Sequence, residues 1–537
     1  MANHFLGIDV GTGSARAGLF DEQGTLLASA KADIAIWHGS GGIVEQSSND
    51  IWQAVCTSVR ATVSKAGVPP ESVAGIGFDA TCSLVALGQD GRPLAVGSSG
   101  DPERNIIVWM DHRATEQARR INGTGETVLN YVGGSISPEM ETPKLLWLAE
   151  NMPRTFTAAW QFMDLADFLT WKATASLARS VCTVTCKWTY LAHESRWDES
   201  YFRRVGLGQL ADESFKRIGT EIVPGGTALG NGLTAQAAAD LGLEPGTAVA
   251  AGLIDAHAGG VGTVGARGDV GNVLTRMAYV FGTSACTMSS TREPAFVPGV
   301  WGPYFSAMVP GLWLNEGGQS AAGAAIDHLV QMHPASEKAA KMARDSGIGL
   351  SQWLSQEAER RGGAAAVARL VGDVHVVPEF LGNRAPFSDP DARGLIAGLS
   401  TDTSLEGLVA LYLAGVCGLG YGARQIVQVQ AERAVLIDTI VVSGGAGQST
   451  LVRQLLADTT GKVVAAPTSE EPVLLGSAIL GAVAAGQHRD VADAMSSMSA
   501  IGETYQPNPM TAEWHEKRFK AFEMLQQTAR TIRNGSL

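Results

Sequence analysis

Two short glycine-rich segments of the sequence contain the residue types that hold phosphate groups. The first, Asp9 to Ser14, reads DVGTGS and places a carboxylate just before a hydroxyl flanked by glycines. Backbone amides and the side chain of Thr12 can hold phosphate oxygens, with Gly13 and Ser14 in the same turn, while Asp9 can orient Mg²⁺ through bound water. Glycine and aspartate are also common in plain β-hairpin turns, and for this segment taken alone the turn is the favoured interpretation.

The Gly-Thr pair recurs at Gly282 and Thr283. Two such loops at matching points of a duplicated core can clamp a triphosphate, and the repetition favours this hypothesis over two unrelated turns. A third glycine segment, Ser443 to Gly447, separates a predicted strand from a predicted helix. Backbone N–H groups at such a junction point towards an anion, so Gly444 and Gly445 suit the nucleoside end of a nucleotide, although the junction alone is weakly specific.

Asp255 is the candidate catalytic base. It lies in a stretch of mostly small residues, Gly252 to Gly260. Phosphoryl transfer needs an acceptor oriented in line and a base that takes its proton, and an aspartate facing a cleft can do so. An aspartate at the N-cap of a helix has the same local sequence, so the segment alone leaves both interpretations open. For His257, packing or hydrogen bonding is favoured over catalysis.

The elements predicted around these residues begin with a three-stranded meander. Apolar runs at 5–10, 17–20 and 25–34, separated by turn residues, predict its strands. Apolar residues at helical spacing over 50–66 predict a helix, and 73–78 is again a strand. The order βββ, α, β therefore opens the chain.

The second half of the chain reads as another copy of this core. Two mixed α/β lobes with a cleft between them fit the pattern, with a hinge near 264–273. The segments 299–313 and 336–366 are interpreted as insertions, the latter helical and rich in alanine. The elements expected in the second lobe are strands at 277–281, 285–289 and 439–442 and helices at 405–431 and 449–459.

Length and composition favour a multi-domain protein with small-molecule partners. The 537 residues exceed one ordinary domain. A net charge of -13 without runs of Lys and Arg argues against nucleic acid. Six cysteines without disulfide spacing, an N-terminus without signal features and the lack of a long uncharged apolar stretch predict a cytoplasmic location and no membrane partner. Cys182 and Cys186 are a poor zinc motif, because no second Cys/His pair of zinc-site spacing accompanies them.

Taken in order, these motifs resemble the FGGY family of carbohydrate kinases over nearly the whole chain. The resemblance implies an α/β fold of two ribonuclease-H-like lobes, as in actin, Hsp70 and hexokinase, with an interdomain cleft. It implies a sugar-binding lobe over residues 1–266 and an ATP-binding lobe over 267–537. The matching segments are Asp9 to Ser14, Trp109 to Arg113, Gly252 to Ala256, Phe281 to Thr283, Glu316 to Ser320 and Ser443 to Ala446.

The resemblance also implies roles for individual residues. ATP and Mg²⁺ are the implied cofactors, with Asp9 and Asp255 near the metal and the acceptor, and Thr12 at the γ-phosphate. Asp255 is implied both as the base and as a substrate-binding residue. Ser449 stands where relatives often have Asn, which weakens its expected contact with adenine. The implied nucleotide-binding residues are Thr12, Gly13, Ser14, Gly282, Thr283, Gly444, Gly445 and Ser449.

The sugar-lobe residues favour a pentulose over glycerol. Ala80 and Thr81 stand where glycerol kinases carry an Arg-Glu pair. Lys187 and Glu316 resemble the lysine and glutamate with which ribulokinases hold their sugar, and Trp109 completes the expected substrate-binding set. A surface lysine lying along a neighbouring tryptophan is the alternative for Lys187.

The stretches 134–147 and 173–193 look closest to the D-ribulokinase branch. The expected reaction is therefore the ATP-dependent conversion of D-ribulose to D-ribulose 5-phosphate. L-ribulose, D-xylulose and ribitol are alternative substrates, and a non-catalytic actin-like nucleotide switch is an alternative of another class. The expected partners are a small-molecule sugar and, in a homodimer, a second copy of the chain.

Overall fold

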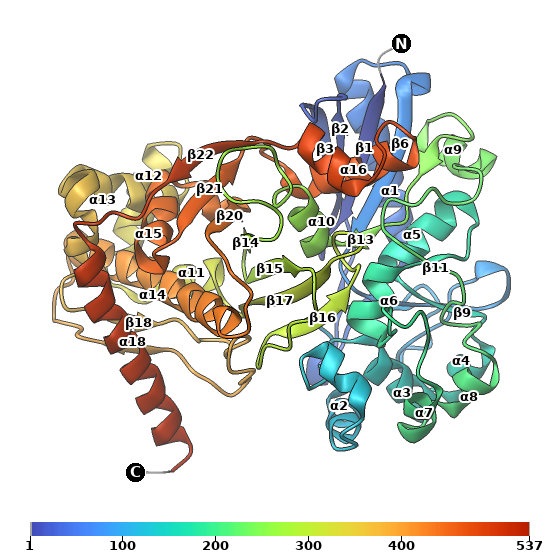
Figure 1. Ribbon diagram of the computed structural model, residues 1–537, viewed down its shortest axis with the longest axis horizontal. Coiled ribbons are helices and arrows are strands. Elements are labelled where there is room, and N and C mark those ends of the chain that lie inside the picture. Colours follow the sequence, from blue (N-terminus) through green and yellow to red (C-terminus); the bar gives the residue numbers. More distant parts are fainter. Residues whose placement is uncertain (1–2, 536–537) are drawn as a thin grey trace.

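In the computed structural model, which describes residues 3–535, a mixed sheet forms the base of the first lobe (Figure 1). Its strand order is β12-β6-β1-β2-β3, and β13 also pairs with β6. The predicted meander and the strand that follows the first helix are confirmed. The strands are β1 (His4–Val10), β2 (Ser14–Phe20), β3 (Leu26–Asp33), β6 (Val73–Ala80), β12 (Ala248–Val249) and β13 (Leu253–Ile254).

Helix α1 (Ser48–Ala66) packs against β2 and β3. Its apolar residues recur at helical spacing and form one buried side, which is what holds a helix on a sheet. The Ser47 side chain caps it by accepting a hydrogen bond from the backbone N–H of Asp50 at 3.3 Å, and Gly67 ends it in the left-handed conformation. The helix predicted over 50–66 is confirmed.

A second, five-stranded sheet and several helices enlarge the first lobe. Its strand order is β4-β5-β8-β7-β9. The strands are β4 (Trp37–His38), β5 (Val44–Gln46), β7 (Leu84–Leu87), β8 (Ile106–Ile107) and β9 (Gln161–Asp164); the helices are α2 (Thr115–Asn122), α3 (Glu141–Asn151), α4 (Pro153–Ala158), α5 (Leu165–Thr174), α6 (Val181–Trp188), α7 (Glu199–Arg204), α8 (Gly208–Asp212) and α9 (Ala235–Leu241).

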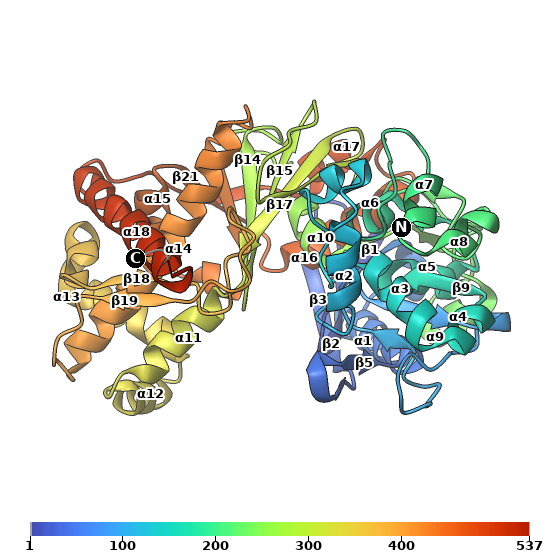
Figure 2. The same ribbon diagram turned by 90° about the horizontal axis from the view of Figure 1, so that it is seen from below.

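The second lobe is built on a seven-stranded sheet of order β16-β17-β15-β14-β20-β21-β22. In Figure 2 its strands β14, β15 and β17 lie between the helices of the two lobes. The predicted strands of this lobe are confirmed. Its strands are β14 (Arg276–Phe281), β15 (Ala285–Thr291), β16 (Trp301–Phe305), β17 (Trp313–Gln319), β20 (Thr439–Ser443), β21 (Val463–Pro467) and β22 (Ile501–Tyr505).

The interpretation of 299–313 as an insertion is wrong, because this segment contains β16, an edge strand of the second-lobe sheet. The strand contains Pro303, and its pairing with β17 is irregular between Trp301 and Tyr304. A proline within a short run argues against a strand in sequence reasoning, whereas an edge strand tolerates one.

The helices of the second lobe pack around a separate apolar core. The long helix α14 has the length and composition to span a membrane, and 72% of its most apolar window is buried inside the protein. The predicted helices at 405–431 and 449–459 are confirmed, as is the helical character of 336–366. The helices are α11 (Gly323–Met332), α12 (Ser336–Asp345), α13 (Leu350–Ala366), α14 (Leu405–Ala431), α15 (Thr450–Thr460) and α18 (Ala512–Arg533). The buried residues of α17 (Val491–Met498) belong instead to the apolar core that includes first-lobe residues.

Helix α16 (Pro472–Ala484) comes late in the chain but packs on the first-lobe sheet, beside β1 and β6 (Figure 1). Glycine makes this close approach feasible: a Cβ added at Gly7 would clash with the carbonyl of Leu474, and one at Gly77 with that of Ser477. The helix backbone therefore lies almost on the strands. Because a late helix covers the first-lobe sheet, the division of the chain at residues 266 and 267 stays a prediction.

We expect Gly7→Ala to separate α16 from β1. The clashing atoms belong to backbone that cannot rotate away, so we expect a cost of about 3 kcal/mol, at the upper end of ordinary overpacking, and a melting temperature lower by about 5 °C or more. Gly208→Ala is the matched control, since its Cβ meets only ordinary contacts at 3.6 Å and beyond. Equal melting temperatures for the two variants would contradict the close packing.

Candidate active site

Three aspartates meet at one edge of the first-lobe sheet. The strands β1, β6 and β13 are parallel, and β6 pairs with both of the others. Asp9 is the register partner of Asp79, and Asp255 follows the last residue of β13. Parallel strands bring their carboxyl ends to the same edge, where ligands bind in α/β folds. The sheet therefore places three carboxylates at a single site.

Asp255 is the first residue of α10 (Asp255–Val261) and not its N-cap, which is Ile254. Its Oδ1 accepts a hydrogen bond from the adjacent backbone N–H of Ala256 at 2.7 Å. The N-cap interpretation of this residue is therefore wrong. The carboxylate instead stands at the junction of β13 and α10, next to the other two aspartates.

Crowding of these carboxylates changes their titration. Burial, followed by the charge of Asp9, raises the pKa of Asp255 to about 6 and holds the pKa of Asp79 well above its usual value. Arg16 offsets part of the charge, since its Nε donates to Asp9 Oδ2 at 2.9 Å and its Nη1 to Glu471 Oε2 at 2.8 Å. Asp79 therefore tends to keep its proton, while Asp255 ionises close to neutral pH.

A divalent cation fits this cluster. Asp79 Oδ1 is buried and has no hydrogen-bond partner among the described residues. Mg²⁺ binds carboxylate oxygens and keeps several of its waters, and its charge would relieve the repulsion among the three aspartates. The residues therefore suit a magnesium ion, with Asp9 and Asp255 as its candidate ligands.

The two candidate phosphate loops face open space. A Cβ at Gly13 would meet nothing within 4 Å, and one at Gly282 only the carbonyl of Ser284, at 3.6 Å. Neither glycine has a left-handed φ, so neither backbone conformation nor internal packing requires glycine there. Open space beside backbone amides is what a phosphate group needs. Thr12 in the first loop accepts a hydrogen bond at Oγ1 from Trp109 Nε1 at 3.0 Å.

A cavity of about 770 Å³ lies in the second lobe beside the second loop, a size typical of cofactor pockets. It brings together four predicted nucleotide-binding residues: Gly282, Thr283, Gly445 and Ser449. A Cβ at Gly445 would again meet no atom within 4 Å. The Ser449 hydroxyl caps α15, accepting from Val452 N at 3.4 Å. The Ser449 side chain therefore already makes a hydrogen bond at the wall of the cavity.

Gly444 lies in an adjacent hollow of about 330 Å³. Thr468 and Pro472 also line this hollow, and Glu471, immediately before Pro472, accepts the hydrogen bond from Arg16 described above. The residues just before α16 therefore lie beside both this hollow and Arg16, the hydrogen-bond partner of Asp9.

Lys187 and Glu316 are buried near Asp255. Lys187 lies in the last turn of α6, and its Nζ lies 5.2 Å from the ring centroid of Trp301, which is the register partner of Glu316. Burial opposes the charge of Glu316, but Lys187 and His257 lower its pKa to about 2. The charge of Lys187 limits the rise in the pKa of Asp255, and Glu316 Oε2 lies 3.2 Å from Nε2 of His257, two residues after Asp255.

The surface interpretation of Lys187 is wrong, because only 6% of this residue is exposed. Burial opposes its charge, but Cys82 and Glu316 more than offset that effect, and its pKa lies well above the usual value. The lysine is therefore a buried cation.

The remaining predicted substrate residues connect the end of β6 with the first phosphate loop. Ala80 ends β6, and the backbone N–H of Thr81 donates to the carbonyl of Val10 at 3.0 Å. The hydroxyls of Thr81 and Ser83 are 3.3 Å apart, and Ser83 Oγ accepts from the backbone N–H of Trp109 at 3.1 Å. Through the Trp109 ring this chain reaches Thr12, so the sugar-lobe residues lie next to the first phosphate loop.

Four residues of this region have no catalytic or ligand-binding role in the sequence analysis. Asp79 is the next-to-last residue of its strand, as Asp9 is of β1, a signal that could have identified it. Arg16 shows no such signal, because only the antiparallel register of β1 and β2 places it opposite Asp9. His257 Nε2 lies 3.2 Å from Glu316 Oε2, so the expected hydrogen-bonding role is confirmed. Arg384 lies over Trp301 at 5.5 Å from the ring centroid, and nothing in the sequence points to it.

Comparison with known proteins agrees with this geometry. Residues 4–262 match the model for the N-terminal domain of the FGGY family of carbohydrate kinases, and residues 277–485 match its C-terminal domain. An FGGY carbohydrate kinase domain-containing protein of Danio rerio is 45% identical over 535 residues, which cover 98% of this chain and 97% of the relative. A D-ribulokinase of Saccharomyces cerevisiae is 38% identical over 514 residues, covering 90% of this chain and 72% of the relative.

Solved structures of low sequence identity share the fold. A xylulose kinase from Rhodospirillum rubrum superposes with a TM-score of 0.79 at 21% identity, covering 99% of both chains. The expected two-lobed α/β fold is thereby confirmed. With both family domains matched and near full-length relatives above 30% identity, the chain belongs to the FGGY family of carbohydrate kinases and is an ATP-dependent sugar kinase.

Proposed function

We propose that this kinase phosphorylates a pentulose, and that D-ribulose is its substrate, giving D-ribulose 5-phosphate. The observation that carries the proposal is the burial of two opposite charges, Lys187 and Glu316, with Glu316 hydrogen-bonded to His257, two residues after Asp255. A lysine that donates to a ketose oxygen and a glutamate that accepts from hydroxyls would orient a polyol chain. The similarity to a yeast D-ribulokinase supports the same choice.

Asp255 is the proposed general base. Its raised pKa makes it a competent proton acceptor near neutral pH, and it would take the proton of the attacking hydroxyl as the new P–O bond forms. Lys187 and Glu316 would hold that hydroxyl in line, and Trp109 and Thr81 would close the sugar side. Burial of these groups excludes water, which limits idle hydrolysis of ATP.

Magnesium-bound ATP would supply the phosphoryl group, with the metal neutralising charge on the phosphate oxygens. Asp9 and Asp255 are the proposed metal ligands, and Arg16 keeps Asp9 in place. Thr12 and Thr283 are the proposed hydroxyl contacts of the phosphates. The other proposed nucleotide contacts are Gly13, Ser14, Gly282, Gly444, Gly445 and Ser449, with Ala80 on the sugar side.

The substrate can be tested with a panel of sugars in a coupled assay of ADP release. We expect kcat/KM to be highest for D-ribulose and at least tenfold lower for L-ribulose, D-xylulose and ribitol, because buried groups that match one set of hydroxyls are left unpaired by another. Glycerol serves as the negative control. A higher kcat/KM for D-xylulose, the sugar named in several structural neighbours, would overturn the choice of D-ribulose.

The pH profile tests Asp255 separately. The pKa of the metal-free carboxylate is raised to about 6, and bound Mg²⁺ would lower it, so we expect kcat/KM for the sugar to be level above pH 6 and to fall only at lower pH, as the carboxylate is protonated. The measurement is made at saturating MgATP in a buffer series of constant ionic strength. A fall of kcat/KM that begins well above pH 6 would contradict the assignment.

The family membership removes the alternative of a non-catalytic nucleotide switch. A cytoplasmic location, the lack of nucleic-acid and membrane partners and a homodimeric assembly stay predictions. Size-exclusion chromatography with light scattering on the full chain would measure the assembly directly.

A further inference from the structure

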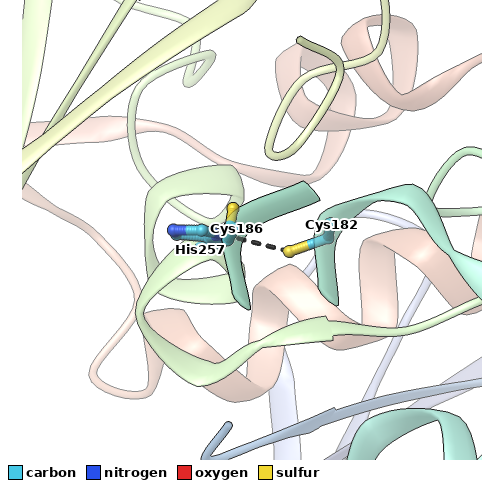
Figure 3. A group of neighbouring side chains, drawn as sticks. All are labelled: Cys182, Cys186 and His257. Carbon is cyan, nitrogen blue, oxygen red and sulfur yellow. Dashed lines mark hydrogen bonds between the residues drawn. The ribbon is translucent and has the colours of Figure 1, made fainter. Parts of the chain in front are cut away.

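Two cysteines and a histidine form a buried cluster beside the proposed sugar site (Figure 3). Cys182 and Cys186 stand one turn apart on α6, and His257 lies on α10. The exposed fraction of each residue is 0%. Cys182 Sγ lies 3.0 Å from His257 Nδ1, and one ligand atom from each of the three residues lies within 4.8 Å of the other two. Both cysteines are free thiols.

Glu316 determines which nitrogen of His257 faces the sulfur atoms. Nε2 donates to Glu316 Oε2, at 3.2 Å, so Nδ1 is the nitrogen that points at Cys182. A histidine that binds a metal through one nitrogen usually donates the other N–H to a carboxylate, which fixes the ring. Glu316 is therefore already placed to fix the ring of His257 in this way.

The donor set selects the class of cation. Thiolate and imidazole ligands favour Zn²⁺ and similarly soft ions, whereas Mg²⁺ prefers carboxylates and water. Standard tetrahedral zinc bonds place two sulfur atoms about 3.8 Å apart and sulfur about 3.6 Å from nitrogen. The cluster would reach that geometry with side-chain shifts of about 1 Å.

We propose that Cys182, Cys186 and His257 form a zinc-binding site with three protein ligands and a fourth position for water. The sequence alone argues against zinc there, because no second Cys/His pair of zinc-site spacing accompanies the two cysteines. The fold supplies the third ligand from α10, in the residue two positions after Asp255.

Zinc in this site would oppose sugar binding. Lys187 follows Cys186 directly, and Glu316 is the hydrogen-bond partner of His257. Two thiolates cancel the charge of Zn²⁺, so the cluster adds no net charge beside Lys187. A metal-bound imidazole donates more strongly through its other nitrogen, so His257 would draw on the charge of Glu316, one of the two groups proposed to hold the sugar. This consequence rests on the proposed function, whereas zinc binding itself does not.

Cobalt titration tests the site without sugar or ATP. We expect full-length, chelator-treated protein, in excess Mg²⁺ to fill the carboxylate site, to bind one Co²⁺ per chain, with a thiolate-to-cobalt charge-transfer absorption that Zn²⁺ abolishes. Cys182→Ser and Cys186→Ser should each lower the affinity at least tenfold and weaken that band. Cys417→Ser, at a buried free cysteine on α14, is the matched control and should keep both.

Circular dichroism and the melting temperature identify a variant that fails to fold. If one cysteine variant does not fold, the cobalt titration of the other cysteine variant tests the site. No charge-transfer band at one equivalent of Co²⁺, or a band that survives in a folded Cys182→Ser or Cys186→Ser protein, would overturn the site.

The consequence is measured by calorimetric titration of D-ribulose into zinc-loaded and metal-free protein. We expect the Kd for the sugar to be at least threefold higher in the zinc-loaded form. Equal Kd values would overturn the antagonism while leaving the site intact. If neither form binds D-ribulose, the proposed substrate fails and the cobalt result stands by itself.

Discussion

Replacing Asp255 by Asn lowers kcat for sugar phosphorylation by about 10²- to 10⁴-fold, the usual contribution of a general base. The amide keeps the size of the side chain but cannot accept the proton of the attacking hydroxyl. It also removes one of three crowded carboxylates, so the fold has no reason to suffer: burial and the charge of Asp9 already oppose the ionised form. The measurement is steady-state ADP release at saturating sugar and ATP.

Binding measurements separate this chemical effect from a structural one. We expect the Asp255→Asn variant to bind sugar with a Kd within about threefold of the wild type, because the carboxylate acts on the proton and not on affinity. The control is Asp33→Asn, at an aspartate whose side chain is 86% exposed on β3. Full turnover by the Asp255→Asn enzyme would remove Asp255 from the mechanism.

Local sequence predicted the strands that carry the site because their apolar runs end abruptly in glycine or aspartate. β1, β6 and β14 could be identified in this way, and with them Asp9, the two Gly-Thr loops and the strand end at Ala80. Such signals depend only on neighbouring residues, so they need no knowledge of the tertiary structure.

Contacts between distant segments were not predictable in the same way. Arg16 lies beside Asp9 because of strand register, and Glu471 reaches Arg16 only because α16 returns to the first lobe. The close packing of α16 on the first-lobe sheet depends on glycines in β1 and β6. The sequence does not distinguish these glycines from turn glycines. The cluster of Cys182, Cys186 and His257 likewise forms only when α6 meets α10.

Asp255 illustrates how local and distant information combine. Its neighbours alone left base and helix cap equally open, and the family motifs favoured the base. The structure excludes the helix-cap interpretation of Asp255, because Ile254 occupies the N-cap position. Burial, together with the parallel register that brings Asp9 to the same edge, then explains why its pKa rises.

Lys187→Met should lower kcat/KM for the sugar by about a hundredfold or more. The substitution keeps an unbranched side chain of similar length in a buried position but removes the only group proposed to donate from this side of the sugar. It also leaves Glu316 with one positive neighbour fewer, which raises the pKa of that carboxyl group. The loss should appear mainly in sugar affinity, measured as KM and by calorimetry.

Two controls decide how the Lys187→Met result is understood. Lys341→Met changes an exposed lysine on α12 and should leave kcat/KM unchanged. ATP affinity, measured without sugar, should also be unchanged in Lys187→Met, because the nucleotide cavity is lined by second-lobe residues. A folded Lys187→Met enzyme that keeps kcat/KM within threefold of the wild type would show that the sugar is held elsewhere. If ATP and sugar affinities fall together, the lysine instead supports the packing of α6 against the second lobe.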